Sequence, residues 1–135
     1  MLFRLAATSA ILALFVAAIP VFAHHSVQAQ FDLNKPILLT GKVAKVEWIN
    51  PHSYLLLDVN DDKGNTKRWA FEMAGPGALR KSGLSRADRG GLKAGDTVTV
   101  NGVRAKDGTD LGLIKNITLP DGRVFTIWTN DPYAK

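Results

Sequence analysis

Residues 37–51 read ILLTGKVAKVEWINP, and the pattern of apolar positions within them decides the fold. Apolar or small residues alternate with polar ones from Leu39 to Val43, as in a strand with one buried face. The alternation resumes at Val46 in the opposite phase, and a one-residue slip of this kind indicates a β-bulge, which bends a strand. We therefore predict a long, bent first strand that stops before Pro51, since proline cannot donate to a sheet.

The chain after this strand predicts a series of short strands broken by turn-forming residues. Strands are expected at 53–59, 66–73, 97–105 and 111–119, with a sixth at 123–128. A short helix is expected at 76–82, and Ser85 is expected to cap a second helical turn over 86–88. The alternating apolar residues that should face inward are Leu55, Leu57 and Val59; Trp69, Phe71 and Met73; Val98 and Val100; and Leu113, Ile117 and Leu119.

This order of elements predicts an all-β fold with one short helix. Five strands with a helix between the third and fourth, and a bent first strand that lets the sheet close, favour an OB-like Greek-key barrel of five to six strands over 37–128. The alternative is an open α+β sheet with the helix packed on one face. Residues 24–36 are expected to form an extended lead-in, with Phe31 docked on the body, and residues 129–135 a C-terminal tail.

Residues 1–23 have the layout of a secretory signal peptide. Arg4 supplies the positive charge, an apolar stretch follows, and Val21 and Ala23 are the small residues that signal peptidase accepts before the cut. The alternative is an uncleaved membrane anchor, because the apolar stretch has about the length that spans a bilayer. Cleavage predicts an exported protein, periplasmic or else secreted, with no stable membrane insertion afterwards because no later stretch is apolar enough.

The composition of the mature chain, His24 to Lys135, limits its chemistry. It has no cysteine, which excludes disulfides, thiolate metal sites and thiol catalysis. The full chain carries 17 Lys and Arg against 12 Asp and Glu, and loss of Arg4 reduces the net charge from +5 to +4. We expect an anionic lipid headgroup or polymer as a partner before nucleic acid, because the protein is exported.

Several motifs together resemble one family. They are Ala23-His24-His25-Ser26, Val46-Glu47-Trp48-Ile49-Asn50-Pro51-His52, Trp69-Ala70-Phe71-Glu72-Met73, Leu92-Lys93-Ala94-Gly95-Asp96 and Thr118-Leu119-Pro120-Asp121-Gly122. The family is an uncharacterised group of small exported bacterial proteins, known as a domain of unknown function, and the resemblance covers essentially the whole mature chain. It implies an exported bacterial protein and brings no established activity.

The three histidines suggest a copper site. Cleavage after Ala23 would give His24 a free α-amine, so that its amine and its imidazole can chelate one metal ion. An imidazole from His25 or His52 would complete three nitrogen ligands, a set that suits copper(II) and resembles the histidine brace of some copper proteins. Met73 is a lesser candidate, since a thioether suits copper(I). In the alternative, His24 and His25 are solvated, His52 is a turn residue and Met73 is core.

A second hypothesis is a non-metal binding module. Aromatic and basic residues on one barrel face could bind an extracytoplasmic polymer, a lipid headgroup or a protein partner. The candidates are Trp48, Tyr54, Trp69, Lys45 and Arg68. In the alternative, the aromatic residues are part of the core, the basic residues are a solvated rim, and none of them binds a ligand. We expect a binding protein in preference to an enzyme, because no spacing of Ser53, histidine and aspartate marks a catalytic triad.

Overall fold

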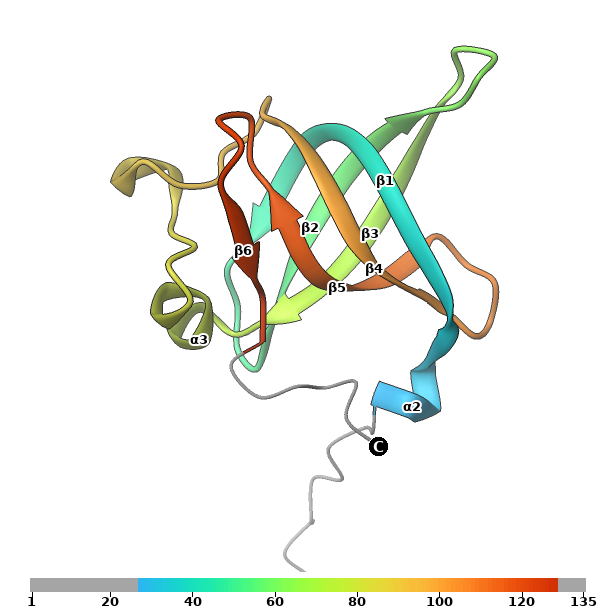
Figure 1. Ribbon diagram of the computed structural model, residues 1–135, viewed down its shortest axis with the longest axis horizontal. Helices are drawn as coiled ribbons and strands as arrows, with labels where there is room; N and C mark the ends of the chain where they lie inside the picture. The colour runs from blue at the N-terminus through green and yellow to red at the C-terminus, as the bar shows by residue number, and fades with distance from the viewer. Residues whose placement is uncertain (1–26, 129–135) are drawn as a thin grey trace, which may run out of the picture.

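Six strands make up most of the computed structural model, which describes residues 27–128 (Figure 1). The strands are β1 (Phe31–Glu47), β2 (His52–Asn60), β3 (Thr66–Ala74), β4 (Thr97–Ala105), β5 (Leu111–Thr118) and β6 (Val124–Thr126). The helical elements are α2 (Val27–Gln30), α3 (Pro76–Lys81) and a 3₁₀ turn η1 (Ala87–Arg89). No helix within 27–128 is long and apolar enough to cross a membrane.

The strands close into a ring. Their order is β3-β2-β1-β4-β5-β6, and an additional parallel pairing of β3 with β5 joins the two sides. The other neighbouring pairs are antiparallel, and among the strands of residues 27–128 the last one, β6, pairs with β5 alone. The predicted all-β fold with a short helix between the third and fourth strands is therefore confirmed in an OB-like, unevenly closed ring, and the open sheet is excluded.

The predicted bulge lies in the middle of β1. The register against β2 shifts between Val43 and Lys45, so Ala44 is the extra residue. On its other edge β1 pairs with β4 from Phe31 to Lys42, with a second shift between Asp32 and Pro36. The bend gives β1 two partners along its length, and Figure 1 shows it arching over the top of the ring.

The first strand begins at Phe31, earlier than the expected Ile37, and the lead-in also contains α2. The reason is packing on the outside of the sheet. Phe31 is buried in a second, outer cluster with Val103, Ala105 and Leu113. The partly buried residues around this outer cluster are Val27, Leu33, Leu111 and Trp128. The expected docking of Phe31 is thus observed, and it holds residues 31–36 against β4.

The main core contains the inward faces that the sequence predicts, with one correction. Leu55, Leu57, Phe71 and Met73 are completely buried there. Leu113, expected in phase with Ile117, instead lies in the outer cluster. Its place in the main core is taken by Ile114, because the register of β4 against β5 shifts between Asn101 and Gly102 and reverses the phase of β5.

The helix and the 3₁₀ turn between β3 and β4 lie where the sequence predicts them, but their capping differs from the prediction. The helix α3 ends at Lys81, one residue before the expected end. The 3₁₀ turn η1 starts after Arg86 and has no side-chain cap. The prediction that Ser85 caps this turn was wrong, since the Ser85 hydroxyl donates to the Arg89 carbonyl, at the other end of the turn.

The β4–β5 irregularity gives a stability prediction. A Cβ atom at Gly102 would lie 2.1 Å from the carbonyl oxygen of Leu113, so Gly102→Ala must displace the backbone of β5. We expect a loss of about 1–3 kcal/mol, the usual cost of overpacking, measured by urea unfolding. Gly77→Ala is the control, because a Cβ there meets nothing within 4 Å. Equal stability of the two variants would contradict this account of the register shift.

Candidate functional site

His52 and Glu72 form an ion-pair contact on the outer face of the β2–β3 hairpin. The Nδ1 atom of His52 lies 2.5 Å from Oε1 of Glu72. His52 pairs with Ala74 and Tyr54 pairs with Glu72 in the ladder, so the contact is diagonal across the two strands. The Glu72 side chain is 8% exposed and that of His52 is 39% exposed. A buried carboxylate therefore holds a histidine that reaches solvent.

Tyr54 is the third member of this cluster, and its hydroxyl donates to Glu72. Partial burial of Tyr54, the negative charge of Glu72 and the hydrogen bond between them together raise the pKa of the phenol, in that order of importance. Tyr54 thus stays protonated at neutral pH and serves as a donor. Glu72 accepts from two neighbours on β2, which compensates for its burial.

Trp128 covers one side of His52. The two rings meet edge to face, with centroids 5.5 Å apart and planes at 84°. The indole Nε1 donates to the carbonyl of Ile114 at 2.8 Å, which fixes the indole ring. Trp128 also packs against both the main core and the outer cluster. The imidazole is therefore positioned by a carboxylate from β3 and by an aromatic edge from the chain after β6.

This arrangement leaves one nitrogen of His52 for a ligand. A carboxylate accepts hydrogen bonds, so Nδ1 carries the hydrogen that points to Glu72, and in the neutral imidazole Nε2 is the nitrogen with a lone pair. Histidines that bind metals usually donate their other ring N–H to a carboxylate or carbonyl in this way. Such a partner sets the tautomer and the direction of the ring and increases the basicity of the ligand nitrogen.

The other residues predicted to bind a metal do not join His52 in the described part of the chain. His24 and His25 lie outside residues 27–128. Met73 is completely buried and pairs with the buried Ser53, on the face of the hairpin opposite to His52. Within residues 27–128, no group of three or more His, Asp or Glu side chains is arranged to hold a metal ion.

Three of the residues predicted to form a binding face, Lys45, Tyr54 and Arg68, lie on the outer face of neighbouring strands β1, β2 and β3. Trp69 is buried and stacks on Phe71. The guanidinium carbon of Arg104 lies over Trp69, 4.9 Å from the ring centroid. The side chain of Arg68 makes two hydrogen bonds to Asp58. Lys45 pairs with Glu47 on its own strand, and Tyr54 belongs to the Glu72 cluster. Trp48 lies at the end of β1, beside a hollow lined by arginines. Trp69 thus faces the core, and the binding face stays a prediction for the others.

Sequence reasoning missed Glu72, although the signal was present. Residues 61–65 form the hairpin loop, and tight antiparallel pairing away from this loop places position 72 opposite 54. With period-two alternation, His52, Tyr54 and Glu72 then share one face. The three arginines near Trp48 were missed for another reason, since they come from a helix and a loop whose approach the sequence pattern does not encode.

The raised pKa of Tyr54 can be tested by titration. The tyrosinate absorbance of the protein minus that of Tyr54→Phe should give a midpoint above 10.0, the ordinary value of a tyrosine. Because the folded-state pKa is raised, the stabilisation by Tyr54 is present below pH 10 and is lost as pH rises through the folded value. Glu72→Gln should lower the midpoint and Asp58→Asn should leave it unchanged. A midpoint that Glu72→Gln does not move would contradict the contact.

Comparison with known proteins places the chain in a family. The model of a family of unknown function, DUF6152, matches residues 12–116, which is well over half of the chain. No curated protein matches the chain, and no solved structure does. The resemblance seen in the sequence motifs is thus confirmed at the level of an uncharacterised family. The chain belongs to the DUF6152 family of unknown function.

Proposed function

We propose that this protein is an exported, periplasmic binding protein for a transition-metal ion, copper in the first instance, with His52 as the ligand on the barrel. The observation that carries the proposal is the 2.5 Å contact between Nδ1 of His52 and Oε1 of Glu72. It leaves Nε2 for the metal and supplies the outer-shell carboxylate that metal-bound histidines favour. Export rests on the signal-like residues 1–23.

The remaining ligands in this proposal come from the start of the mature chain. Cleavage after Ala23 gives His24 an α-amine and an imidazole, and His25 adds a second imidazole. Nitrogen ligands of this kind suit copper(II). Magnesium and calcium bind oxygen ligands instead, so a set made of nitrogen atoms favours copper over either of them. Met73 takes no part, because it is buried on the other face of the hairpin.

The position of Val27 supports this assignment. Val27 packs on the outer cluster, and Trp128 packs on the same cluster and touches His52. The segment that joins His24 to Val27 has three peptide steps, a span of at most about 10 Å. In Figure 1, α2 and the turn between β1 and β2 both lie toward the lower end of the ring. Val27, the first residue that the structure describes, thus packs on the same cluster as Trp128.

The environment of His52 favours binding over hydrolysis. An acyl-transfer site needs a nucleophile within hydrogen-bonding reach of the histidine. Ser53 is completely buried and points to the opposite face from His52. The hydroxyl that does lie in the cluster belongs to Tyr54, and its raised pKa makes it a poor nucleophile.

Copper titration of the mature protein tests the role of His52. We expect Glu72→Gln to weaken copper binding by about 10- to 100-fold, the usual effect of removing an outer-shell partner, and His52→Ala to weaken it further. Glu47→Gln is the matched control, because Glu47 pairs with Lys45 on β1 and not with His52. Unfolding by urea verifies that each variant is folded. Equal copper affinity of His52→Ala and the unchanged protein would overturn the proposal.

The terminal amine is tested separately. Protein whose mass shows a start at His24 should bind copper more tightly than the same protein with the α-amine of His24 acetylated, since an acetylated nitrogen has no basic lone pair to offer the metal. An extra glycine after Lys135 is the control and should leave the affinity unchanged. If acetylation leaves the copper affinity unchanged, the amine is not a ligand, whatever His52 does.

A further inference from the structure

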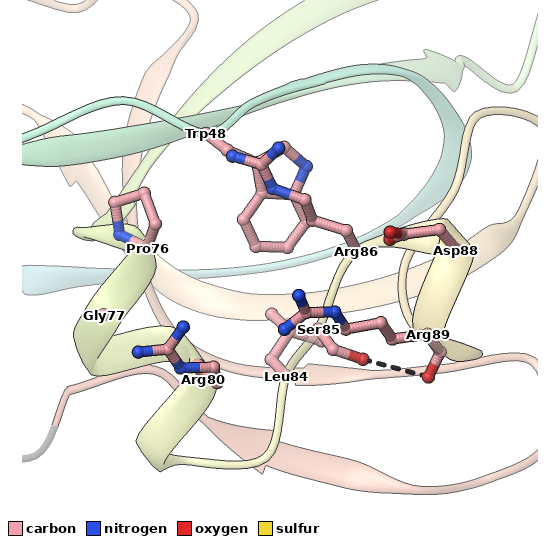
Figure 2. A pocket seen from close by; sticks show the side chains of 9 residues that line it. All are labelled: Trp48, Pro76, Gly77, Arg80, Leu84, Ser85, Arg86, Asp88 and Arg89. Carbon is pink, nitrogen blue, oxygen red and sulfur yellow. Dashed lines mark hydrogen bonds between the residues drawn. The ribbon is translucent and has the colours of Figure 1, made fainter.

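A hollow of about 340 Å³ lies between the end of β1, the helix α3 and the loop that carries η1 (Figure 2). Its lining residues are Trp48, Pro76, Gly77, Arg80, Leu84, Ser85, Arg86, Asp88 and Arg89. Its volume lies at the lower end of the range of small-molecule sites, about 300–1,000 Å³. The lining is separate from the His52 cluster and from every residue that the copper proposal uses.

Three arginines dominate the charge of this hollow. Arg80 comes from α3, and Arg86 and Arg89 come from the loop around η1. Figure 2 shows Arg86 extending along Trp48, and Arg89 extending from the η1 turn toward α3. Asp88 is the single carboxylate in the lining, so the charged side chains sum to +2.

These arginines differ from the other arginines of residues 27–128 in having no carboxylate partner there. Arg68 pairs with Asp58, Arg104 with Asp110 and Arg123 with Asp121. Arg80, Arg86 and Arg89 form no ion pair with any residue of the described segment, and all three are exposed. Arginines elsewhere on the barrel are neutralised locally, whereas those around this hollow keep their charge for a ligand.

The backbone around the hollow is held by packing and hydrogen bonds. Leu79, Leu84 and Leu92 are buried in the main core and anchor α3 and the loop. The amide of Leu84 donates to the Leu79 carbonyl and that of Leu92 to the Ser85 carbonyl, each at 3.0 Å. The arginines therefore project from a fixed base, which reduces the entropy that a ligand must overcome.

Trp48 provides the aromatic wall of the hollow. It packs on the main core, and the Arg86 guanidinium lies 5.8 Å from its ring centroid. The contact steers a guanidinium whose planar donor fork matches the oxygens of a phosphate or a carboxylate. A second hollow shares Trp48, Arg86 and Asp88 with the first and is also lined by Lys93 and by Lys45, which pairs with Glu47.

We propose that this arginine hollow binds a small, soluble anion that carries at least two negative charges and belongs to the class of phosphate esters and linked phosphates. Three guanidinium groups supply up to three two-pronged contacts, more than a single monoanion can use. A tetrahedral phosphate presents oxygens in several directions, which fits donors that approach from both α3 and the loop.

Calorimetry with pyrophosphate at constant ionic strength tests the proposal. We expect saturable binding at one site, weakened about tenfold or more by each of Arg80→Ala, Arg86→Ala and Arg89→Ala, in line with the value of a charge-assisted contact. Lys81→Ala is the matched control, because it removes one positive charge from the same helix outside the hollow. It should change the affinity less than twofold. The same loss in Lys81→Ala as in Arg80→Ala would overturn the site in favour of general charge attraction.

Two comparison ligands identify the anion class, and one variant separates this site from the copper proposal. Citrate should bind more weakly than pyrophosphate, and equal or tighter binding would overturn the phosphate assignment. Binding to vesicles containing phosphatidylglycerol without saturable binding of pyrophosphate would show a membrane ligand and overturn the soluble one. His52→Ala should bind pyrophosphate normally, so failure of either proposal leaves the other standing.

Discussion

The bend of β1 is the constraint on which the rest of the structure depends. One strand must pair with β4 along its first part and with β2 along its last part, and the extra residue Ala44 allows this change of partner. Once β1 is bent, β3 and β5 can meet as a parallel pair and the ring closes. The side chains at alternate positions then fill the ring and exclude water, which supplies the main stabilisation in a chain without disulfides.

Part of the outer surface of the ring is covered by apolar side chains, and one of these, Trp128, contacts His52. A second apolar cluster forms on the outer face where the start of β1 lies against β4 and β5, and Trp128 covers part of it. The same indole meets the imidazole of His52, whose other side contacts the buried carboxylate of Glu72. Burial makes the carboxylate depend on its donors, His52 and Tyr54, and the three groups therefore fix one another's positions.

The barrel thus has two polar constellations with different chemistry. Around His52, a buried carboxylate orients a single imidazole, an arrangement suited to a soft or borderline metal ion. Around Trp48, three arginines without carboxylate partners in residues 27–128 face one hollow, an arrangement suited to an anion. The net charge of the chain is consistent with the second, since a positive surface attracts anions from solution.

The sequence by itself determined the strands, the bulge and the inward faces of β2 and β3, because those features depend on local alternation and turn residues. It also carried the family resemblance, and it predicted a signal-like leader and a ligand role for His52. Only the tertiary structure decided that Glu72 and Trp128 hold His52, that Met73 lies on the opposite face and that Leu113 leaves the main core. It also decided that Arg80, Arg86 and Arg89 line one hollow with Trp48. These outcomes depend on register shifts and on contacts between segments distant in the chain, and local periodicity carries no information about either.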